Sequence, residues 1–360
     1  MRRTPALIVG GGPAGSAAAI TLARGGVRPV VLERHAAADA ICGGFVSWRT
    51  LERLATLGVD PATLGGDPID TVELFAGRHR RTATLPGGGM GVSRRRLDGL
   101  LRDAAVRAGA AVETGVTVRT LENGVARLAD GGEMAGDAIF LATGKHDLRG
   151  SARPAGARGE DPTLGLRVRL SPSAANRASM AGRVELHLFD RGYVGLVLQE
   201  DGSANLCLAV HRSRLNEAGN PAALLTELAR EAPVLAERLA DLTADPPVDA
   251  IANVPYGWRA RTTEHGLYRL GDQAGVIPSL AGEGMGIAIA SGIGAGQARL
   301  RGESAPDWQA RFARRIAAPI AIAGAARRLA ESRRAAGFLP VIPTSLVGWV
   351  AQMTRVGQRP

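Results

Sequence analysis

The sequence predicts an α/β protein with a Rossmann-like nucleotide-binding domain, an inserted and mostly antiparallel β-sheet, and a helical C-terminal segment. The first prediction rests on a strand, glycine turn, helix, strand and acid that follow one another at the start of the chain. The second rests on alternating apolar and polar residues within positions 161–259. With 360 residues, 45% of them hydrophobic, the chain is long enough for two lobes with cores of their own.

The nucleotide-binding pattern opens the chain. An apolar run at residues 6–9 leads into Gly10-Gly11-Gly12-Pro13-Ala14-Gly15, and an alanine-rich helix is expected over residues 16–24. A second apolar run, over residues 27–32, ends at Glu33. This order of elements is typical of a dinucleotide-binding fold.

Each part of the pattern has a physical role. Gly10 permits the tight turn, Gly12 lets the backbone approach a pyrophosphate, and Gly15 lets the helix pack closely on the strand. The N-terminal N–H groups of the helix attract the diphosphate. Glu33 is placed to accept a hydrogen bond from a ribose hydroxyl. The pattern alone does not distinguish FAD from NAD.

A second glycine-rich pattern lies near the other end of the chain. A strand-like run at residues 266–270 leads into Gly271-Asp272, and Gly282-Glu283-Gly284-Met285-Gly286 then opens a helix of small residues over 287–298. This order predicts a second helix N-terminus close to a ligand.

Together the two patterns resemble the flavoprotein superfamily that contains p-hydroxybenzoate hydroxylase and the geranylgeranyl reductases. The resemblance implies that the cofactor is FAD and that the nucleotide-binding domain has the p-hydroxybenzoate hydroxylase type of fold. In that superfamily an aspartate in the position of Asp272 contacts the ribityl chain. The helix start at Gly282 to Gly286 would direct N–H groups at the flavin, where a helix N-terminus stabilises the charge of the reduced ring.

Shorter segments extend the resemblance. Cys42-Gly43-Gly44 is similar to the Cys-Gly-Gly that geranylgeranyl reductases place beside the isoalloxazine ring. Arg94 takes the position of a helix-start arginine that contacts FAD, and residues 111–118 are similar to a strand whose backbone meets the adenine. The residues expected to hold FAD are Gly10, Gly12, Pro13, Ala14, Gly15, Glu33, Arg34, Cys42, Gly43, Gly44, Arg94, Val116, Gly144, Gly271, Asp272, Gly282, Gly284, Met285 and Gly286.

Two departures from the superfamily affect function. Where the monooxygenases have Gly-Ala-Asp-Gly, this chain has Ala142-Thr143-Gly144-Lys145, and the missing acid argues against the familiar route of NAD(P)H handling. No second glycine fingerprint predicts a nicotinamide domain, so NAD(P)H is expected only as a transient reductant. Where geranylgeranyl reductases have Tyr-x-Trp-x-Phe-Pro, this chain has Tyr193-Val194-Gly195-Leu196-Val197-Leu198. Lys145, the only lysine, is either a phosphate or substrate contact or a plain surface residue.

The FAD-binding domain is expected to be discontinuous along the chain. It would comprise residues 1–70, 90–160 and 260–304, the sheet domain residues 71–89 and 161–259, and the helical segment residues 305–360. Leucines near helical spacing predict one helix over residues 221–242.

Catalytic residues are harder to assign. The candidates for a proton donor or an aromatic pocket wall are His187, Tyr193, His211, Tyr256 and Trp258, with ordinary packing as the competing interpretation. We select Tyr193, together with Cys42, which is either a proton donor or a small apolar residue near the flavin. The two cysteines provide no disulfide framework or zinc site, and no metal is expected.

The composition limits the partners. The net charge of +10 comes without a helix-turn-helix, zinc-finger spacing or aromatic-basic repeat, so no nucleic acid partner is expected. Two cysteines fit a reducing cytoplasm, and no apolar run of about 18 residues predicts a membrane span. The basic helices after residue 305 and the apolar residues 338–350 either close the FAD lobe or rest on the inner membrane surface. The oligomeric state stays open.

The sequence therefore predicts an FAD-dependent oxidoreductase with a small lipophilic or aromatic substrate. Hydroxylation of an aromatic or polyketide-like lipophilic molecule by a flavin monooxygenase is the leading interpretation. Reduction of an isoprenoid or other lipophilic C=C bond is the second, favoured by Cys42-Gly43-Gly44 and weakened by the missing Tyr-x-Trp-x-Phe-Pro. An electron-transfer flavoprotein without a small-molecule substrate is the third.

Overall fold

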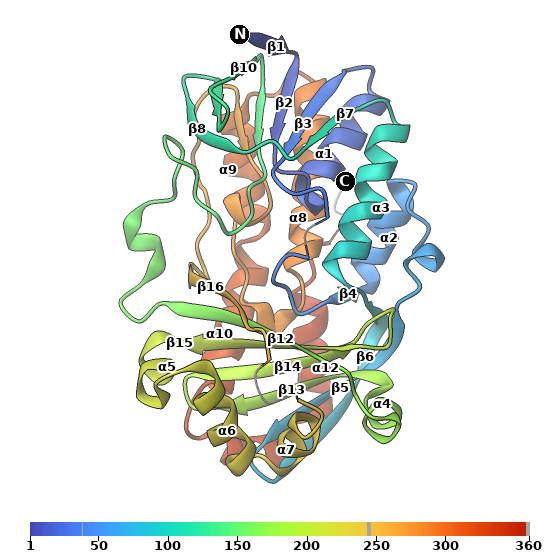
Figure 1. Cartoon of the computed structure of the whole chain (residues 1–360), viewed down its shortest axis with the longest axis vertical. Helices are drawn as coiled ribbons and strands as arrows, with labels where there is room; N and C mark the ends of the chain where they lie inside the picture. Colours follow the sequence, from blue (N-terminus) through green and yellow to red (C-terminus); the bar gives the residue numbers. More distant parts are fainter. Residues whose placement is uncertain (38, 243–245, 358–360) are drawn as a thin grey trace.

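The computed structural model describes residues 1–37, 39–242 and 246–357. Two lobes follow one another along the long axis of the molecule (Figure 1). One lobe contains a parallel sheet and the N-terminal helices, and the other contains an eight-stranded sheet. The C-terminal helices extend from the first lobe to the second (Figure 1).

The first lobe is built on a five-stranded parallel sheet with the order β17-β11-β2-β3-β7. Its strands are β2 (Ala6–Val9), β3 (Pro29–Glu33), β7 (Ala111–Thr114), β11 (Ile139–Leu141) and β17 (Leu267–Arg269). All of β2 is buried, as expected for a central strand covered on both faces. Because the strands are parallel, the turns that follow β2, β11 and β17 meet at one edge of the sheet.

Helices cover one face of this sheet and a smaller sheet covers the other. The helices are α1 (Pro13–Arg24), α3 (Arg94–Arg107) and α8 (Gly284–Leu300). The smaller sheet has the order β1-β10-β9-β8 and consists of β1 (Arg2–Thr4), β8 (Val118–Glu122), β9 (Val125–Leu128) and β10 (Glu133–Gly136). Helices α1 and α8 pack so closely that a Cβ at Gly292 would lie 2.2 Å from the carbonyl oxygen of Ala14.

The second lobe is an eight-stranded sheet with the order β16-β12-β15-β14-β13-β5-β6-β4. Every neighbouring pair is antiparallel except β13 and β5. The strands are β4 (Phe45–Ser47), β5 (Asp67–Ala76), β6 (His79–Gly91), β12 (Thr163–Leu170), β13 (Gly182–Phe189), β14 (Gly192–Leu198), β15 (Ala204–His211) and β16 (Asp249–Val254). The sheet therefore joins three stretches of sequence.

Two helices, α6 (Pro221–Glu231) and α7 (Pro233–Leu239), cover part of this sheet. The prediction of one helix over residues 221–242 is wrong. Ala232 has extended dihedral angles, φ −129° and ψ 98°, and separates the two helices. The residue before a proline is disfavoured in helical geometry, and Pro233 cannot donate a backbone hydrogen bond.

The C-terminal segment divides between the lobes. Helix α9 (Ala305–Arg315) packs on the first lobe, where Trp308 stacks on Phe312. Helix α12 (Thr344–Met353) instead lies against β6, and its Val347 and Ala351 pack on the eight-stranded sheet. The helices between them are α10 (Ala317–Ala330) and α11 (Ala335–Phe338).

The remaining elements are short. They are α2 (Trp48–Thr56), α4 (Ala174–Met180), α5 (Arg212–Ala218), and the 3-10 turns η1 (Pro61–Leu64), η2 (Ala155–Arg158), η3 (Gly271–Gln273), η4 (Ser279–Ala281) and η5 (Leu339–Val341). Within the described ranges, no single helix has the length and apolar character needed to cross a membrane. The segments Ala335–Val341 and Thr344–Met353 reach that length only together, and a bend of 105° separates them.

Candidate active site

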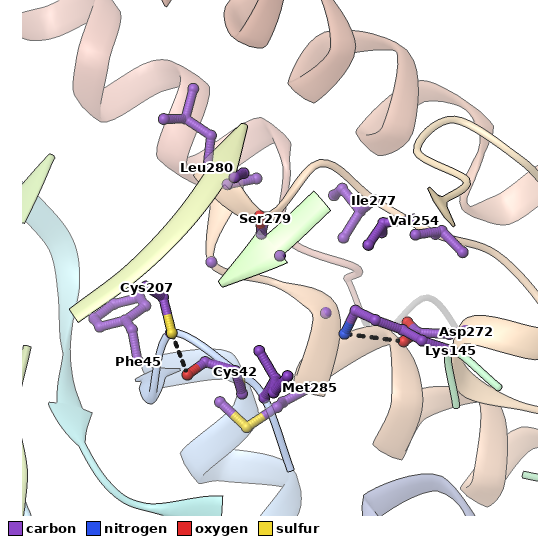
Figure 2. Close-up of a pocket in the computed structure, with 18 of the residues that line it drawn as sticks. Cys42, Phe45, Lys145, Cys207, Val254, Asp272, Ile277, Ser279, Leu280 and Met285 are labelled. Atoms are coloured by element: carbon purple, nitrogen blue, oxygen red, sulfur yellow. Dashed lines mark hydrogen bonds and ion pairs between the residues drawn. The ribbon is translucent and has the colours of Figure 1, made fainter. Parts of the chain in front are cut away.

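A cavity of about 1090 Å³ lies between the two lobes and continues beneath the C-terminal helices. The turns after β2, β11 and β17 line one end of it, and the eight-stranded sheet lines the other. Figure 2 shows the middle of the cavity, where Cys42, Met285, Lys145 and Asp272 approach one another. The two kinds of wall suggest a cofactor end and a substrate end.

The glycine turn after β2 forms the first wall of the cofactor end. Gly10 has a φ of 107°, and a Cβ there would lie 2.4 Å from the carbonyl oxygen of Ala142. At Gly15 a Cβ would lie 1.9 Å from the carbonyl oxygen of Gly10, so this glycine permits the close approach of helix and strand. Helix α1 starts at Gly12 without a side-chain cap, which leaves its first N–H groups free for a ligand.

Glu33 fixes this turn as well as lining the cavity. Its Oε2 accepts a hydrogen bond from the backbone N–H of Gly11 at 2.6 Å, and its Oε1 accepts one from the N–H of His35 at 3.0 Å. The acid that the sequence assigns to a ribose hydroxyl is therefore held in place by the glycine turn itself.

Arg94 lies at the start of α3, opposite the glycine turn. A Cβ on Gly12 would lie 3.3 Å from its Nη2. Its guanidinium donates two hydrogen bonds of 2.8 Å to the Asp98 carboxylate. Burial lowers the pKa of Arg94, but the attraction of Asp98 outweighs burial and raises the pKa above its usual range. Arg94 is therefore a fixed, permanent cation at the cofactor end.

Asp272 and Lys145 face each other across the middle of the cavity. Asp272 lies in η3 after β17, and its Oδ2 is 3.4 Å from the Nζ of Lys145 (Figure 2). This carboxylate raises the pKa of Lys145, against the effect of burial. The Nε2 of Gln273 donates to the backbone oxygens of Gly144 and His146 at 2.9 Å and holds the lysine turn in place. Lys145 is thus a cavity residue.

The glycine-rich start of α8 contributes Gly282, Gly284 and Met285 to the cavity wall. No side chain caps the helix, so this is a second open N-terminus at the same cavity. Gly286 has a different role, because a Cβ there would lie 2.2 Å from Oε1 of Glu283. That glycine accommodates a folded-back carboxylate and does not line the cavity.

The Cys42 loop is tied to the second lobe. The backbone oxygen of Cys42 accepts a hydrogen bond from Sγ of Cys207 at 3.0 Å (Figure 2). It also accepts one from Nδ2 of Asn205 at 2.8 Å. Burial raises the pKa of the Cys207 thiol to about 12, so it stays protonated at neutral pH. The sequence did not single out Asn205 or Cys207, because only the fold brings β15 to this loop.

Three hydroxyl groups meet in the cavity wall. The hydroxyls of Tyr193 and Tyr256 both form hydrogen bonds with Oγ of Ser279. Burial raises the pKa of both tyrosines, that of Tyr193 well above its usual value, so both are protonated at neutral pH. We call this group the hydroxyl cluster. Ser279 is its centre, and sequence reasoning missed it.

The other catalytic candidates lie elsewhere. His187 is buried beside Glu185 and stacks on Phe75. His211 bonds Asp161 and Glu331, and none of these residues lines the cavity. Trp258 does not line the cavity either, and its ring packs under Arg153.

Most of the predicted site residues line one cavity, and Gly15 and Gly286 pack beside it. The lining residues among them are Gly10, Gly12, Pro13, Ala14, Glu33, Arg34, Cys42, Gly43, Gly44, Arg94, Val116, Gly144, Tyr193, Gly271, Asp272, Gly282, Gly284 and Met285. Two uncapped helix N-termini, a half-buried arginine and a strand-end aspartate together suit a ligand with a diphosphate, a polyol and a ring that gains negative charge. These residues fit FAD.

Comparison with known proteins agrees with this fit. An FAD binding domain model matches residues 3–139. Digeranylgeranylglycerophospholipid reductase 2 of Methanopyrus kandleri is 27% identical over 330 residues, which cover 86% of this chain and 80% of that protein. A geranylgeranyl bacteriochlorophyll reductase-like protein from Thermoplasma acidophilum superposes with a TM-score of 0.69 at 19% identity, over 99% of this chain and 94% of that one. PqsL of Pseudomonas aeruginosa, described as a probable FAD-dependent monooxygenase, superposes with a TM-score of 0.70 at 17% identity. The superposition covers 95% of this chain and 100% of that one.

The fold and the cavity thus define a flavoprotein that binds FAD. The chain contains an FAD binding domain, is similar in sequence to digeranylgeranylglycerophospholipid reductases and shares its fold with FAD-dependent monooxygenases; it is an FAD-dependent oxidoreductase and hence an enzyme. The predicted fold class is confirmed: a p-hydroxybenzoate hydroxylase type of FAD-binding domain, an inserted and mostly antiparallel sheet, and C-terminal helices.

Proposed function

We propose that the protein reduces a C=C bond in a long lipophilic substrate such as an isoprenoid chain. The observation that carries the proposal is the apolar end of the cavity. Val72 and Leu74 of β5 and Leu186 of β13 line this end together with Leu339 and Val347 of the C-terminal segment, which pack against the same sheet. A largely apolar lining suits an extended hydrocarbon chain.

Different residues of the chain would orient the cofactor, exclude water and donate the proton. When bound and reduced, FAD would supply the hydride. Asp272 and the open N-termini of α1 and α8 would orient the cofactor, and the apolar wall would exclude water from the reaction. The hydroxyl cluster carries the protonated Tyr193, which holds a proton for the second carbon of the double bond.

Hydroxylation is the second candidate. The stretch from Tyr193 to Leu198 lacks the Trp and Pro of geranylgeranyl reductases, and a dry cavity also suits oxygen chemistry. For either reaction we propose NAD(P)H as a transient reductant, tested by substrate-stimulated NAD(P)H consumption.

Anaerobic turnover distinguishes the two reactions. Protein reduced with dithionite is mixed with digeranylgeranylglycerophospholipid, and the lipid is analysed by mass spectrometry. Reduction adds a pair of hydrogens without oxygen. Hydroxylation yields product only in air and incorporates an atom from isotopically labelled O₂. A lipid unchanged under both conditions contradicts the proposed substrate class.

We also propose that the C-terminal segment contacts a membrane surface from which the substrate enters. Residues 335–353 contain no charged side chain, follow Arg333 and Arg334, and expose Val341 (73%) and Trp349 (50%). An exposed apolar segment beside basic residues is typical of an interfacial anchor.

Cosedimentation with vesicles rich in phosphatidylglycerol tests this contact. Val341→Asp is expected to reduce binding. The matched control is Val106→Asp, an exposed valine of α3 in the other lobe. Equal sedimentation of wild type and Val341→Asp contradicts the contact.

A further inference from the structure

A buried cluster of charges joins residues Thr354–Val356, which we call the chain end, to the turn Ala281–Gly284 at the cavity. Glu283 lies between Gly282 and Gly284 and is fully buried (0% exposed), with Arg53 (3%) and Arg355 (7%) beside it. The Nη1 of Arg355 donates to Oε2 of Glu283 at 3.0 Å, and the Nη1 of Arg53 lies 3.7 Å from Oε1. One buried carboxylate is thus shared by two arginines from α2 and the chain end.

Further hydrogen bonds make this junction specific. The backbone N–H of Val356 donates to Oε1 of Glu283 at 3.2 Å, and the hydroxyl of Ser47 donates to Oε2 at 3.0 Å. Arg355 also donates to the backbone oxygen of Ala281 at 2.7 Å. Arg53 donates to the backbone oxygen of Val356. The chain end therefore holds both the side chain and the backbone of the turn.

The cluster fixes the local shape of the FAD site. The carboxylate of Glu283 folds back over the first turn of α8 and occupies the space of a side chain at position 286. The ring of Phe45 fills the space beside Gly282, and Arg355 lies over that ring at 5.9 Å. Gly282 and Gly284, on either side of Glu283, line the cavity. A displaced carboxylate would therefore change the geometry of the helix start that faces the cofactor.

Removing one charged side chain from such a cluster is expected to destabilise the folded protein strongly. A buried ion pair that loses one partner leaves an uncompensated charge in a low-dielectric environment. Burial lowers the pKa of Arg53 and of Arg355, and the attraction of Glu283 opposes this effect. The conformation of the turn therefore depends on the docked chain end, and the position of the chain end depends on the turn.

We infer that Glu283 and Arg355 are positioning residues that make FAD binding and docking of the chain end Thr354–Val356 interdependent. The docked chain end holds the start of α8 in the conformation that accepts FAD, and bound FAD in turn holds the chain end. This coupling is reciprocal, because both events share one conformation of the Ala281–Gly284 turn. The inference depends on FAD binding and is independent of which substrate the enzyme reduces or oxidises.

The first test uses apoprotein titrated with FAD. Arg355→Met keeps most of the side-chain volume and removes the charge, and FAD affinity is expected to fall about tenfold. Arg355→Lys, which keeps a cation for Glu283, is expected to recover part of the affinity. Arg334→Met is the matched control, because Arg334 is an exposed arginine of the same segment. Affinity within twofold of wild type in Arg355→Met, with apoprotein melting unchanged, overturns the inference.

The second test needs no variant and decides the case if Arg355→Met does not fold. Trypsin releases residues 356–360 from the wild type by cleavage after Arg355, and mass spectrometry follows the loss. FAD is expected to slow this release by about the factor by which the docked end strengthens FAD binding. The same release rate with and without FAD overturns the inference.

Discussion

The two ends of the cavity are built in different ways. At the cofactor end, backbone N–H groups, glycines and a few charged residues such as Arg94 and Asp272 form the wall. At the substrate end, apolar side chains from the sheet and from the C-terminal helices face each other. A wall made of backbone tolerates almost no substitution, whereas a wall made of side chains can change its shape residue by residue. Cofactor and substrate binding are therefore separable by mutation.

Among the substitutions that test this difference between the two ends, Gly10→Ala is expected to have the largest effect, a loss of FAD affinity. The added Cβ would collide with the oxygen of Ala142, and the positive φ of Gly10 is unfavourable for alanine. We expect FAD affinity to fall by about 100-fold or more, measured as flavin absorbance per polypeptide. Gly99→Ala in α3 is the control, since no atom lies near its added Cβ. Stoichiometric FAD in Gly10→Ala would contradict the assigned cofactor end.

Tyr193→Phe tests the boundary between the two ends. Loss of the hydroxyl removes the proposed proton donor from the hydroxyl cluster, and kcat is expected to fall about 100-fold with little change in KM. Tyr268→Phe is the control, because its hydroxyl bonds the backbone of Glu303 inside the first lobe. Unchanged turnover in Tyr193→Phe would remove this residue from the chemistry.

Ala351→Phe tests the substrate end alone. Ala351 of α12 lines the apolar wall, and a larger side chain there narrows the cavity. We expect KM for a long-chain substrate to rise about tenfold, while a short-chain analogue and FAD affinity stay unchanged. A matching loss of FAD affinity would show that the two ends are not separable.

His211→Gln is expected to have the smallest effect. His211 joins the end of β15 to Glu331 after α10, and the hydrogen bond with Glu331 raises its pKa above 6.5. The contact therefore stabilises the fold fully below pH 6.5 and is lost as the pH rises through the raised pKa. The wild-type Tm is expected to fall by a few degrees more than that of the variant over this range. Parallel Tm profiles would contradict the role of the histidine.

Much of the cofactor end could be predicted from sequence because its requirements are local. A tight turn needs glycine at position 10. The two cofactor acids can be found because each lies where a strand ends, Glu33 at the end of β3 and Asp272 in the turn after β17. Gly286 shows the limit of this reasoning. Its glycine is required by the folded-back side chain of Glu283, which no pattern in the sequence reveals.

The substrate end was not predictable in the same detail. Ser279 and Cys207 enter the cavity wall because β14, β15 and η4 meet there, and neither residue belongs to a recognisable motif. The C-terminal segment likewise contributes to both lobes, which its sequence does not reveal. Long-range packing decides these positions, whereas sequence patterns report local geometry.

The ion pair of Lys145 with Asp272 has a practical consequence. Because the chain has only one lysine, an amine-selective acylating reagent has a single side-chain target, and that target lies inside the cavity. The N-terminal amine also reacts, so the extent of acylation is read from the mass of the peptide that contains Lys145, and it then reports how fully ligands occupy the centre of the enzyme. The molecule thus contains its own occupancy probe, with no engineered label.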